Sequence, residues 1–308
     1  MRVVIVGAGG VGGLLGALLL RAGAEVAFVA RGEQLRALKG PGLRVKSPLG
    51  AMNTGPLEAA EDPARLAAAD LVLVTVKAWQ VRELSPLLRP LLREGTLVLP
   101  VQNGVEAADD LAAALGEGPV VAAVLHVLSR IEAPGQILHE GLPPRFTVGE
   151  RKGAPKSDRL EKLVATLNRA GIEAKIAPDI AAVLWEKLLF VEPIGSVGAV
   201  ARAPVGALRT IPETRALLAA AMHEIASVAR AAGAGIAPDA AEQALARVEK
   251  LNPAATVSMA RDIEDRRPSE LLDQTGAVVR VGKRVGVPTP VHDFLLASLL
   301  PQEQRARR

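Results

Sequence analysis

The first half of the chain alternates between short apolar runs and amphipathic stretches of helical length. Five runs of aliphatic and β-branched residues are expected to form strands, at residues 2–6, 25–30, 71–76, 95–100 and 120–125. Such continuous runs are typical of parallel strands covered on both faces. Amphipathic stretches at residues 79–93 and 105–115 lie between strands. This alternation predicts an α/β fold built on a doubly wound sheet with right-handed crossovers.

The pattern changes in the middle of the chain. A short antiparallel addition is expected over residues 136–149, where GQILHEG and RFTVGE flank an LPP turn, followed by a helix over 156–170 and a strand over 172–177. From about residue 180 only helices are expected, over residues 180–198, 212–232, 238–250, 254–265, 269–286 and 290–300. The sequence therefore predicts two domains, residues 1–178 and an all-helical domain of residues 179–308.

Composition excludes several classes of function. The 308 residues include no Cys, which removes disulfides, Cys-ligated metals and Cys nucleophiles. With a net charge of +4, four Phe, two Trp and no Tyr, the chain offers little on which nucleic acid bases would stack, so we expect no nucleic-acid partner. There is neither an apolar run of membrane-spanning length nor a secretion signal. We therefore expect no membrane span and a cytoplasmic protein.

A glycine-rich motif follows the first expected strand and opens a helix. Its sequence GAGGVG comprises Gly7, Ala8, Gly9, Gly10, Val11 and Gly12. In a dinucleotide site, the first glycine permits the tight turn, the second admits the pyrophosphate to the backbone, and the third allows the helix to pack closely on the strand. A glycine-rich turn without a ligand is the alternative, but the βαβ context favours a dinucleotide.

The second expected strand ends in FVARG, which places Arg31 where an NAD site usually carries an acidic residue. An arginine can pair with the 2′-phosphate of NADP(H), whereas a carboxylate would repel it. The sequence therefore predicts NADP(H), with a solvated surface arginine as the alternative. Lys77 follows another strand, as a second cofactor-facing cation or as a surface lysine.

The missing residue types narrow the proton-transfer chemistry. Without Tyr there is no Tyr–Lys proton relay, and the four dispersed His, His126, His139, His223 and His292, predict no metal site. The proton-transfer group must then be a Lys, Asp or Glu, or His126, which follows a strand and is more typical of a structural histidine.

Four further segments carry a resemblance to a known family: LVTVKAWQV (73–81), VQNGVE (101–106), LWEKLLF (184–190) and SMARDIEDRRPSE (258–270). With GAGGVG and Arg31, they resemble the ketopantoate reductase (2-dehydropantoate 2-reductase) family over essentially the whole chain. The resemblance implies a Rossmann-type domain, a helical domain resembling that of 6-phosphogluconate dehydrogenase, and an active site between them. It also implies NADPH-dependent reduction of a 2-oxo acid, namely 2-dehydropantoate to pantoate in pantothenate and coenzyme A biosynthesis.

The resemblance also assigns roles to individual residues. Lys187 matches the family's catalytic lysine, and Asn103 matches its asparagine near nicotinamide and substrate. Ser258 and Glu270 match its later active-site pair, and Lys77 matches a lysine that contacts the cofactor. From the pattern alone, Lys187 in its apolar helix is either a snorkelling surface residue or a desolvated functional one. Desolvation would lower its pKa and make it a better proton donor.

The later pair can also be interpreted from the pattern. Glu270 is expected in the first turn of a helix, where the helix dipole favours the carboxylate, so we assign it to orientation, ion pairing or hydrogen bonding of cofactor or substrate. Ser258 would bind the substrate carboxylate, while Asp262, four residues further on, caps or pairs structurally.

The chain departs from the family pattern at four positions that usually carry asparagine. These positions are Val191, Gly195, Val205 and Ala255. Glu192 and Ser196 would substitute if Pro193 shifts the helix register. Because a site that binds a hydroxyl discriminates against analogues without one, these losses lead to the hypothesis of a more apolar 2-oxo acid as substrate.

Two other classes of protein remain as alternatives. A β-hydroxyacid dehydrogenase carries its lysine in a G-x-x-x-N-x-x-K context, which AVLWEK does not match. A non-catalytic NADP-binding sensor would have no need to retain Lys187, Asn103, Ser258 and Glu270. The Ala-rich helices also suggest a homodimer through the helical domain.

Overall fold

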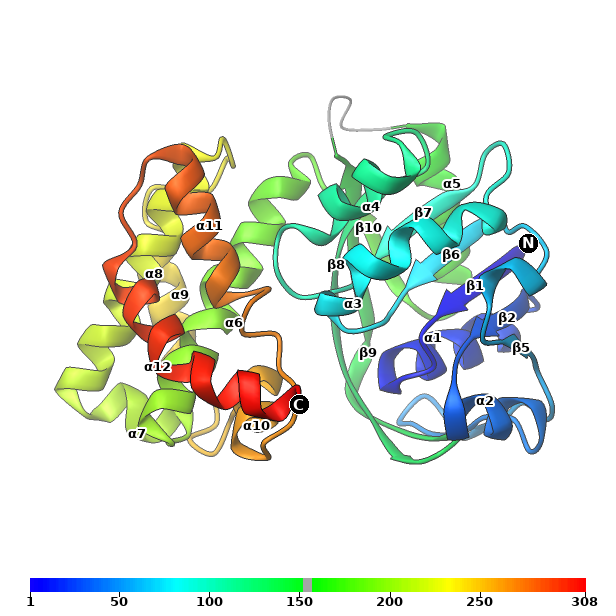
Figure 1. Cartoon of the computed structure of the whole chain (residues 1–308), viewed down its shortest axis with the longest axis horizontal. Helices are drawn as coiled ribbons and strands as arrows, with labels where there is room; N and C mark the ends of the chain where they lie inside the picture. The colour runs from blue at the N-terminus through cyan, green and yellow to red at the C-terminus, as the bar shows by residue number, and fades with distance from the viewer. Residues whose placement is uncertain (152–156) are drawn as a thin grey trace. The chain divides into compact units, whose positions relative to one another are not determined.

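The computed structural model describes residues 1–151 and 157–308, which form two compact units. The α/β unit comprises residues 1–102 and 107–180, and the helical unit comprises residues 103–106 and 181–308 (Figure 1). The linear division expected from the sequence did not anticipate that residues 103–106 belong to the helical unit. In the described part of the chain, no helix is long and apolar enough to cross a membrane.

The α/β unit contains a parallel sheet whose strands follow the order β5-β2-β1-β6-β7. Its strands are β1 (Arg2–Val6), β2 (Glu25–Val29), β5 (Glu58–Ala60), β6 (Leu71–Val74) and β7 (Leu97–Pro100). The connecting helices are α1 (Gly10–Arg21), α2 (Gly32–Lys39), α3 (Ala78–Leu84) and α4 (Ala107–Leu115). The strand interiors are almost wholly buried, which explains their continuous apolar runs. The predicted fold class is confirmed in this unit.

A second sheet in the same unit joins β10, β9, β3 and β4, and β8 pairs with β9. Its elements are β3 (Arg44–Lys46), β4 (Met52–Asn53), β8 (Val121–Ala133), β9 (Gln136–Glu150) and β10 (Glu173–Ile176), and α5 (Asp158–Arg169) precedes the last strand. The predicted start of that helix at residue 156 lies outside the described residues.

The prediction of a hairpin inside residues 136–149 is wrong. These residues belong to one long strand, β9, and its antiparallel partner is β8 (Figure 1). The chain reverses at Gly135 and not at the LPP sequence. Gly135 has a φ of 72°, a left-handed conformation that glycine adopts without strain. Pro143 and Pro144 fit an extended strand because the fixed φ of proline is compatible with it and the register shifts nearby.

Prolines also shorten the predicted helix over residues 79–93. The α-helix α3 ends at Leu84, and a 3₁₀ segment, η2 (Ser85–Leu91), continues the chain. Pro86 and Pro90 lack the N–H groups that an α-helix would need at these positions. A second short 3₁₀ segment, η1 (Pro63–Arg65), precedes β6.

The helical unit is built from α-helices in the part of the chain that the structure describes. They are α6 (Ile180–Ala201), α7 (Val205–Thr210), α8 (Pro212–Ala231), α9 (Ala240–Val248), α10 (Ser258–Glu264), α11 (Thr275–Val285) and α12 (Pro290–Ala306). The sequence pattern did not predict α7, and α10 and α11 are shorter than expected. Leu188, Met222, Ile225 and Val278 belong to its buried core.

Candidate active site

The glycine motif forms a tight turn between β1 and α1. Gly7 has a φ of 108°, and a Cβ at Gly12 would lie 2.0 Å from the Gly7 carbonyl oxygen, so neither position has room for a larger residue. A Cβ at Gly9 would meet no atom within 4 Å. Gly7 and Gly12 therefore serve packing, while Gly9 leaves its backbone open to a ligand.

Thr75, at the end of β6, fixes this turn. Its hydroxyl donates a hydrogen bond to the Gly7 carbonyl oxygen at 2.6 Å, and the Gly7 N–H donates to the carbonyl oxygen of Val29 at 2.9 Å. Sequence reasoning missed Thr75, although it stands beside the Lys77 that the resemblance singled out.

The start of α1 suits a negatively charged group. Within this described turn, no side chain caps the helix at Gly9 and no acidic residue occupies the first turn. The first N–H groups of a helix have no partner inside the helix, and they carry its positive partial charge. The residues present therefore fit the pyrophosphate of a dinucleotide.

Arg31 follows β2 and is the N-cap residue of α2. Its side chain is exposed, and Gly32 next to it has a φ of 58°. The acidic residue in the first turn of α2 is Glu33, and its carboxylate lies 3.6 Å from the Arg36 guanidinium. An exposed guanidinium directly after this strand fits a ribose 2′-phosphate.

Lys77 and Gln102 lie after β6 and β7. Lys77 is exposed, and its Nζ lies 5.7 Å from the centre of the Trp79 ring. The Gln102 side chain is buried and donates hydrogen bonds of 2.8 Å to the carbonyl oxygens of Val74 and Val76. The glutamine of the QNG sequence therefore ties the two strand ends together and holds the backbone next to Lys77.

Lys187 lies half-buried on α6. Burial lowers the pKa of Lys187 from 10.5 to about 8, and the negative charge of Glu270 opposes this decrease. An ammonium with this pKa is a stronger acid than an exposed lysine, yet it is still largely protonated at neutral pH. Lys187 and Glu270 thus interact within the helical unit.

Glu270 is held by two amide side chains. Its Oε2 accepts hydrogen bonds from Asn103 Nδ2 at 3.0 Å and from Gln274 Nε2 at 3.1 Å. The expectation that Glu270 stands in the first turn of a helix is wrong, because α11 begins only at Thr275. These amides, rather than a helix dipole, fix the carboxylate.

The segment of residues 103–106 brings Asn103 to Glu270. A Cβ at Gly104, whose φ is 101°, would lie 2.5 Å from the Asp273 carbonyl oxygen, so only glycine permits this close approach. Glu106 anchors the other end of the segment by accepting a hydrogen bond from Arg280 at 2.5 Å.

Asp273 adds a second carboxyl group beside Glu270. Among the residues that the structure describes, its Oδ2 is buried without a hydrogen-bond partner. Burial, together with the Glu270 charge, raises the pKa of Asp273 to about 6. Sequence reasoning missed this residue, because the segment around Gly104 that packs against it is distant in the chain.

The turn that carries Glu270 is anchored to the last helix. Glu303 on α12 is buried, and its carboxylate accepts a hydrogen bond from the Ser269 N–H at 3.1 Å and a further one from the Ser269 hydroxyl. Arg307 donates to Glu303 at 2.6 Å and to the Ser269 carbonyl oxygen at 3.1 Å. Sequence reasoning missed this anchor.

Ser258 is the half-buried first residue of α10. Asp262, four residues later, accepts hydrogen bonds from Arg267 at 3.1 and 2.9 Å. Asp262 therefore has a structural ion pair, as one of the two sequence-based interpretations expected.

Apolar groups occupy two of the positions where the family pattern has asparagine. A Cβ at Gly195 would lie 2.7 Å from Met259 Cε and 3.2 Å from Val257 Cγ2, so the Met259 side chain fills the space of a larger residue. Val205 is buried, and its backbone N–H donates to the carbonyl oxygen of Ala255 at 3.1 Å.

The hypothesis that Glu192 and Ser196 replace the missing amides is wrong. α6 continues through Pro193, and both side chains are fully buried in the helical unit. The Glu192 carboxylate binds Thr275 and His292, and the Ser196 hydroxyl donates to the Glu192 carbonyl oxygen at 3.1 Å. Neither polar group is left to bind a substrate.

The four histidines are dispersed in the structure as well. His126 and His223 are exposed, whereas His139 is buried against Ser47 and His292 lies in the core of the helical unit. In the described part of the chain, no group of three or more His, Cys, Asp or Glu is placed to hold a metal ion. The expected homodimer and cytoplasmic location stay predictions.

Comparisons with known proteins extend over nearly the whole chain. A family model described as ketopantoate reductase PanE/ApbA matches residues 3–153, and the model of its C-terminal part matches residues 179–303. A 2-dehydropantoate 2-reductase of Mesorhizobium japonicum is 30% identical, with 96% of each chain covered.

Solved structures agree with these sequence matches. The crystal structure of a PanE/ApbA family ketopantoate reductase from Ralstonia eutropha JMP134 has a TM-score of 0.90 at 30% identity, with 100% of each chain covered. A D-mandelate dehydrogenase solved with NADH and anilino(oxo)acetate has a TM-score of 0.89 at 22% identity, with 100% of each chain covered, and at this identity it shows the fold alone. The matches confirm the predicted family resemblance and fold class.

Proposed function

The chain belongs to the ketopantoate reductase family, whose members are NADP-dependent oxidoreductases, and from this premise we propose that it reduces a 2-oxo acid to the 2-hydroxy acid with NADPH. In this proposal Lys187 is the proton donor. 2-Dehydropantoate, from which the relatives take their name, is the first substrate to test, and its reduction belongs to pantothenate biosynthesis.

One observation carries the proposal. Lys187 has a pKa lowered to about 8, and it interacts with a Glu270 carboxylate that Asn103 and Gln274 hold in place. A lysine tuned toward neutral pH next to a fixed carboxylate is suited to general acid catalysis, because the ideal pKa lies near the operating pH.

In the proposed mechanism, bound NADPH would supply the hydride for C2 of the 2-oxo acid. The Lys187 ammonium donates a hydrogen bond to the 2-oxo oxygen, stabilises the negative charge that develops there, and transfers its proton to it. The Glu270 carboxylate orients the ammonium, Asn103 donates a hydrogen bond to cofactor or substrate, and the Ser258 hydroxyl donates one to the substrate carboxylate. Lys187 then regains a proton from water.

The glycine turn and two cations would hold the cofactor. The N–H groups at the start of α1, around Gly9, would bind the pyrophosphate. The Arg31 guanidinium would pair with the 2′-phosphate and thereby select NADP(H), and Lys77 would supply a second positive charge.

The proposal is tested by following NADPH oxidation with a panel of 2-oxo acids for the wild type, Lys187→Ala and Lys283→Ala. Lys283 is an exposed lysine on α11 and serves as the control. We expect Lys187→Ala to lose about 10²-fold or more in kcat/KM. NADPH affinity, measured by the fluorescence of the nucleotide, should change little.

The pH dependence gives a second readout. Because the donor must be protonated, kcat/KM of the wild type should fall above about pH 8, the pKa of Lys187. Tight NADPH binding with no turnover of any 2-oxo acid would instead support the non-catalytic sensor. Full activity of Lys187→Ala would exclude Lys187 as the donor.

A second candidate is the reduction of a more apolar 2-oxo acid. The observation in its favour is the Met259 side chain, which fills the space over Gly195 where the family pattern places an amide. Lys187, Val191 and Gly195 follow one another at intervals of four residues and therefore share one face of α6. After Lys187, neither of the other two positions on this face carries a polar side chain.

A matched substrate pair separates the two candidates. 3,3-Dimethyl-2-oxobutanoate differs from 2-dehydropantoate only by the missing 4-hydroxyl group. A site that binds the hydroxyl would prefer 2-dehydropantoate by several orders of magnitude, whereas an apolar site would reduce the analogue at least as well. A preference for 2-dehydropantoate of more than about 10²-fold would reject the apolar candidate.

A further inference from the structure

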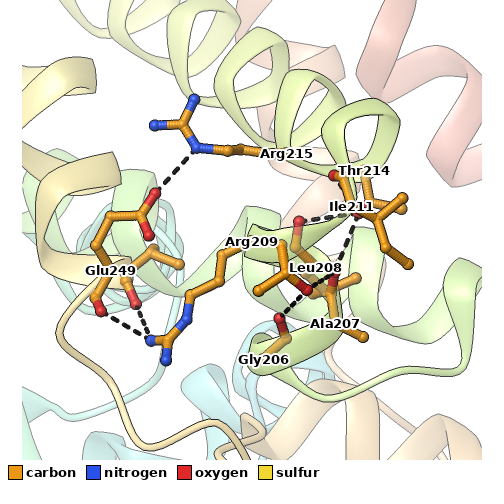
Figure 2. Close-up of polar contacts among 10 residues, drawn as sticks. Gly206, Ala207, Leu208, Arg209, Ile211, Thr214, Arg215 and Glu249 are labelled. Carbon is orange, nitrogen blue, oxygen red and sulfur yellow. Dashed lines mark hydrogen bonds and ion pairs between the residues drawn. The ribbon is translucent and has the colours of Figure 1, made fainter.

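The loop that leads to Ser258 is attached to α7 by one arginine. Arg209, on α7, donates hydrogen bonds from Nη1 to the backbone carbonyl oxygens of Val248 at 3.1 Å, Glu249 at 2.9 Å and Leu251 at 2.7 Å. Figure 2 shows the guanidinium turned toward the backbone at Glu249. These carbonyl groups lie at and beyond the C-terminus of α9, where backbone acceptors have no partner inside the helix.

The same helix holds the next part of the loop through its own backbone. The N–H groups of Val205 and Gly206 donate to the carbonyl oxygens of Ala255 at 3.1 Å and Pro253 at 2.8 Å. A Cβ at Gly206 would lie 2.8 Å from Pro253 Cβ, so the two segments touch closely. The loop is therefore fixed to α7 at both of its ends, and Arg209 is the side chain that fixes the first.

α7 is itself a firm support. Leu208 is buried in the core of the helical unit, and the Thr214 hydroxyl of α8 donates to the Leu208 carbonyl oxygen at 2.9 Å (Figure 2). The positive charge of Arg209 also lies at the negative end of the α9 dipole. Arg209 thus holds residues 248–251, which lead into a segment that has no regular secondary structure from Asn252 to Val257.

We propose that Arg209 is a positioning residue for substrate binding, because it fixes the loop that delivers Ser258. This inference rests on the proposed function, in which Ser258 contacts the substrate carboxylate. The family pattern has asparagines at the positions of Val205 and Ala255, and in this chain a backbone hydrogen bond joins these two residues. Arg209 therefore carries the side-chain part of the attachment.

The test compares Arg209→Ala and Arg209→Lys with a control on the same partner. Arg215→Ala removes an exposed ion pair, in which Arg215 Nε donates to Glu249 Oε1 at 2.9 Å (Figure 2). We expect Arg209→Ala to raise KM for the 2-oxo acid about tenfold or more, because the loop that carries Ser258 loses the hydrogen bonds that the charged guanidinium donates to it. NADPH affinity should stay unchanged, Arg209→Lys should restore part of the loss, and Arg215→Ala should behave as the wild type.

Limited proteolysis supplies a readout that does not need activity. Lys250 is exposed within the loop, so trypsin cleavage after Lys250 reports how firmly the loop is held. We expect this cleavage to accelerate in Arg209→Ala, well below its melting temperature, and to stay unchanged in Arg215→Ala.

The two readouts distinguish this inference from the proposed function. If the wild type has no reductase activity, faster cleavage after Lys250 still supports the attachment by Arg209, and unchanged cleavage overturns it. Faster cleavage with an unchanged KM would overturn the positioning role in an active enzyme. An equal increase in KM in Arg215→Ala would do the same.

Discussion

A buried histidine in the helical unit leads to a prediction about how stability depends on pH. His292 on α12 lies with both ring nitrogens between two carboxylates, Glu224 Oε2 at 2.7 Å from Nδ1 and Glu192 Oε2 at 3.1 Å from Nε2. Glu192 also accepts a hydrogen bond from Thr275 at 2.6 Å, so the cluster joins α6, α8, α11 and α12. Burial lowers the pKa of His292, but the two carboxylates outweigh it and raise the pKa from 6.5 to about 9.

The magnitude follows from this pKa. His292 stays protonated in the folded chain up to about pH 9, whereas an unfolded histidine loses its proton near pH 6.5. The folded state therefore binds more protons between these values. The stabilisation is complete below pH 6.5 and decreases by up to about 1.4 kcal/mol per pH unit above it. Between pH 6.5 and 8 the loss should reach about 2 kcal/mol.

Denaturant unfolding of the helical unit measures this effect through one tryptophan. The chain has two, Trp79 on α3 and Trp185 on α6, so the Trp79→Phe background leaves Trp185 to report the helical unit. In this background, His292→Gln removes the titrating group. His223→Gln is the matched control, because His223 is exposed and its Nε2 lies 3.6 Å from Glu242 in an exposed pair.

We expect His292→Gln to be destabilised by about 3–5 kcal/mol at pH 6.5, since it leaves the buried Glu192 carboxylate without its cation. Its disadvantage relative to the wild type should shrink by about 2 kcal/mol at pH 8. Lys187 and Asp273, whose pKa values are about 8 and about 6, remain in both proteins, so their effects cancel in the difference. Parallel pH curves for wild type and His292→Gln over this range would refute a protonated His292.

Three further predictions concern the candidate active site. Arg31→Ala should raise KM for NADPH about tenfold or more and leave KM for NADH nearly unchanged, because the charge-assisted contact to the 2′-phosphate is lost; equal effects on both cofactors would contradict this assignment. Gly12→Ala should lower the melting temperature and abolish NADPH binding in titrations, because its Cβ would lie 2.0 Å from the Gly7 carbonyl oxygen; wild-type affinity would show that the turn can relax. Glu270→Gln should shift the alkaline limb of the pH–kcat/KM profile to lower pH, because the negative charge that raises the pKa of Lys187 is removed, and an unmoved limb would show that this charge does not act on the donor.

The sequence by itself determined the elements whose cause is local. The strand β1, the glycine turn and α1 depend on residues within one βαβ unit, and the close approach of Gly12 to the Gly7 carbonyl oxygen follows from the spacing of the motif. The end of α3 at Leu84 also has a local cause, since Pro86 and Pro90 act on their own backbone, although the expected helix over residues 79–93 did not take these prolines into account.

Tertiary structure decided the surroundings of Glu270. Its carboxylate is fixed by Asn103, which is 167 residues away in the chain, and the turn that carries it is anchored by Glu303. A local sequence pattern cannot show partners that are so distant in the chain. The helix propensity of residues 269–286 is the same whether or not a distant segment docks against them.

The direction of side chains on α6 was decided in the same way. The residues of this helix are apolar on nearly all of its faces. The sequence therefore could not show which face meets the core and which face carries Lys187. Thr275 and His292, on two other helices, draw Glu192 inward, and Met259 fills the space over Gly195. A local pattern fixes the period of a helix, whereas the packing partners fix its rotation, and this rotation decides which residues reach the site.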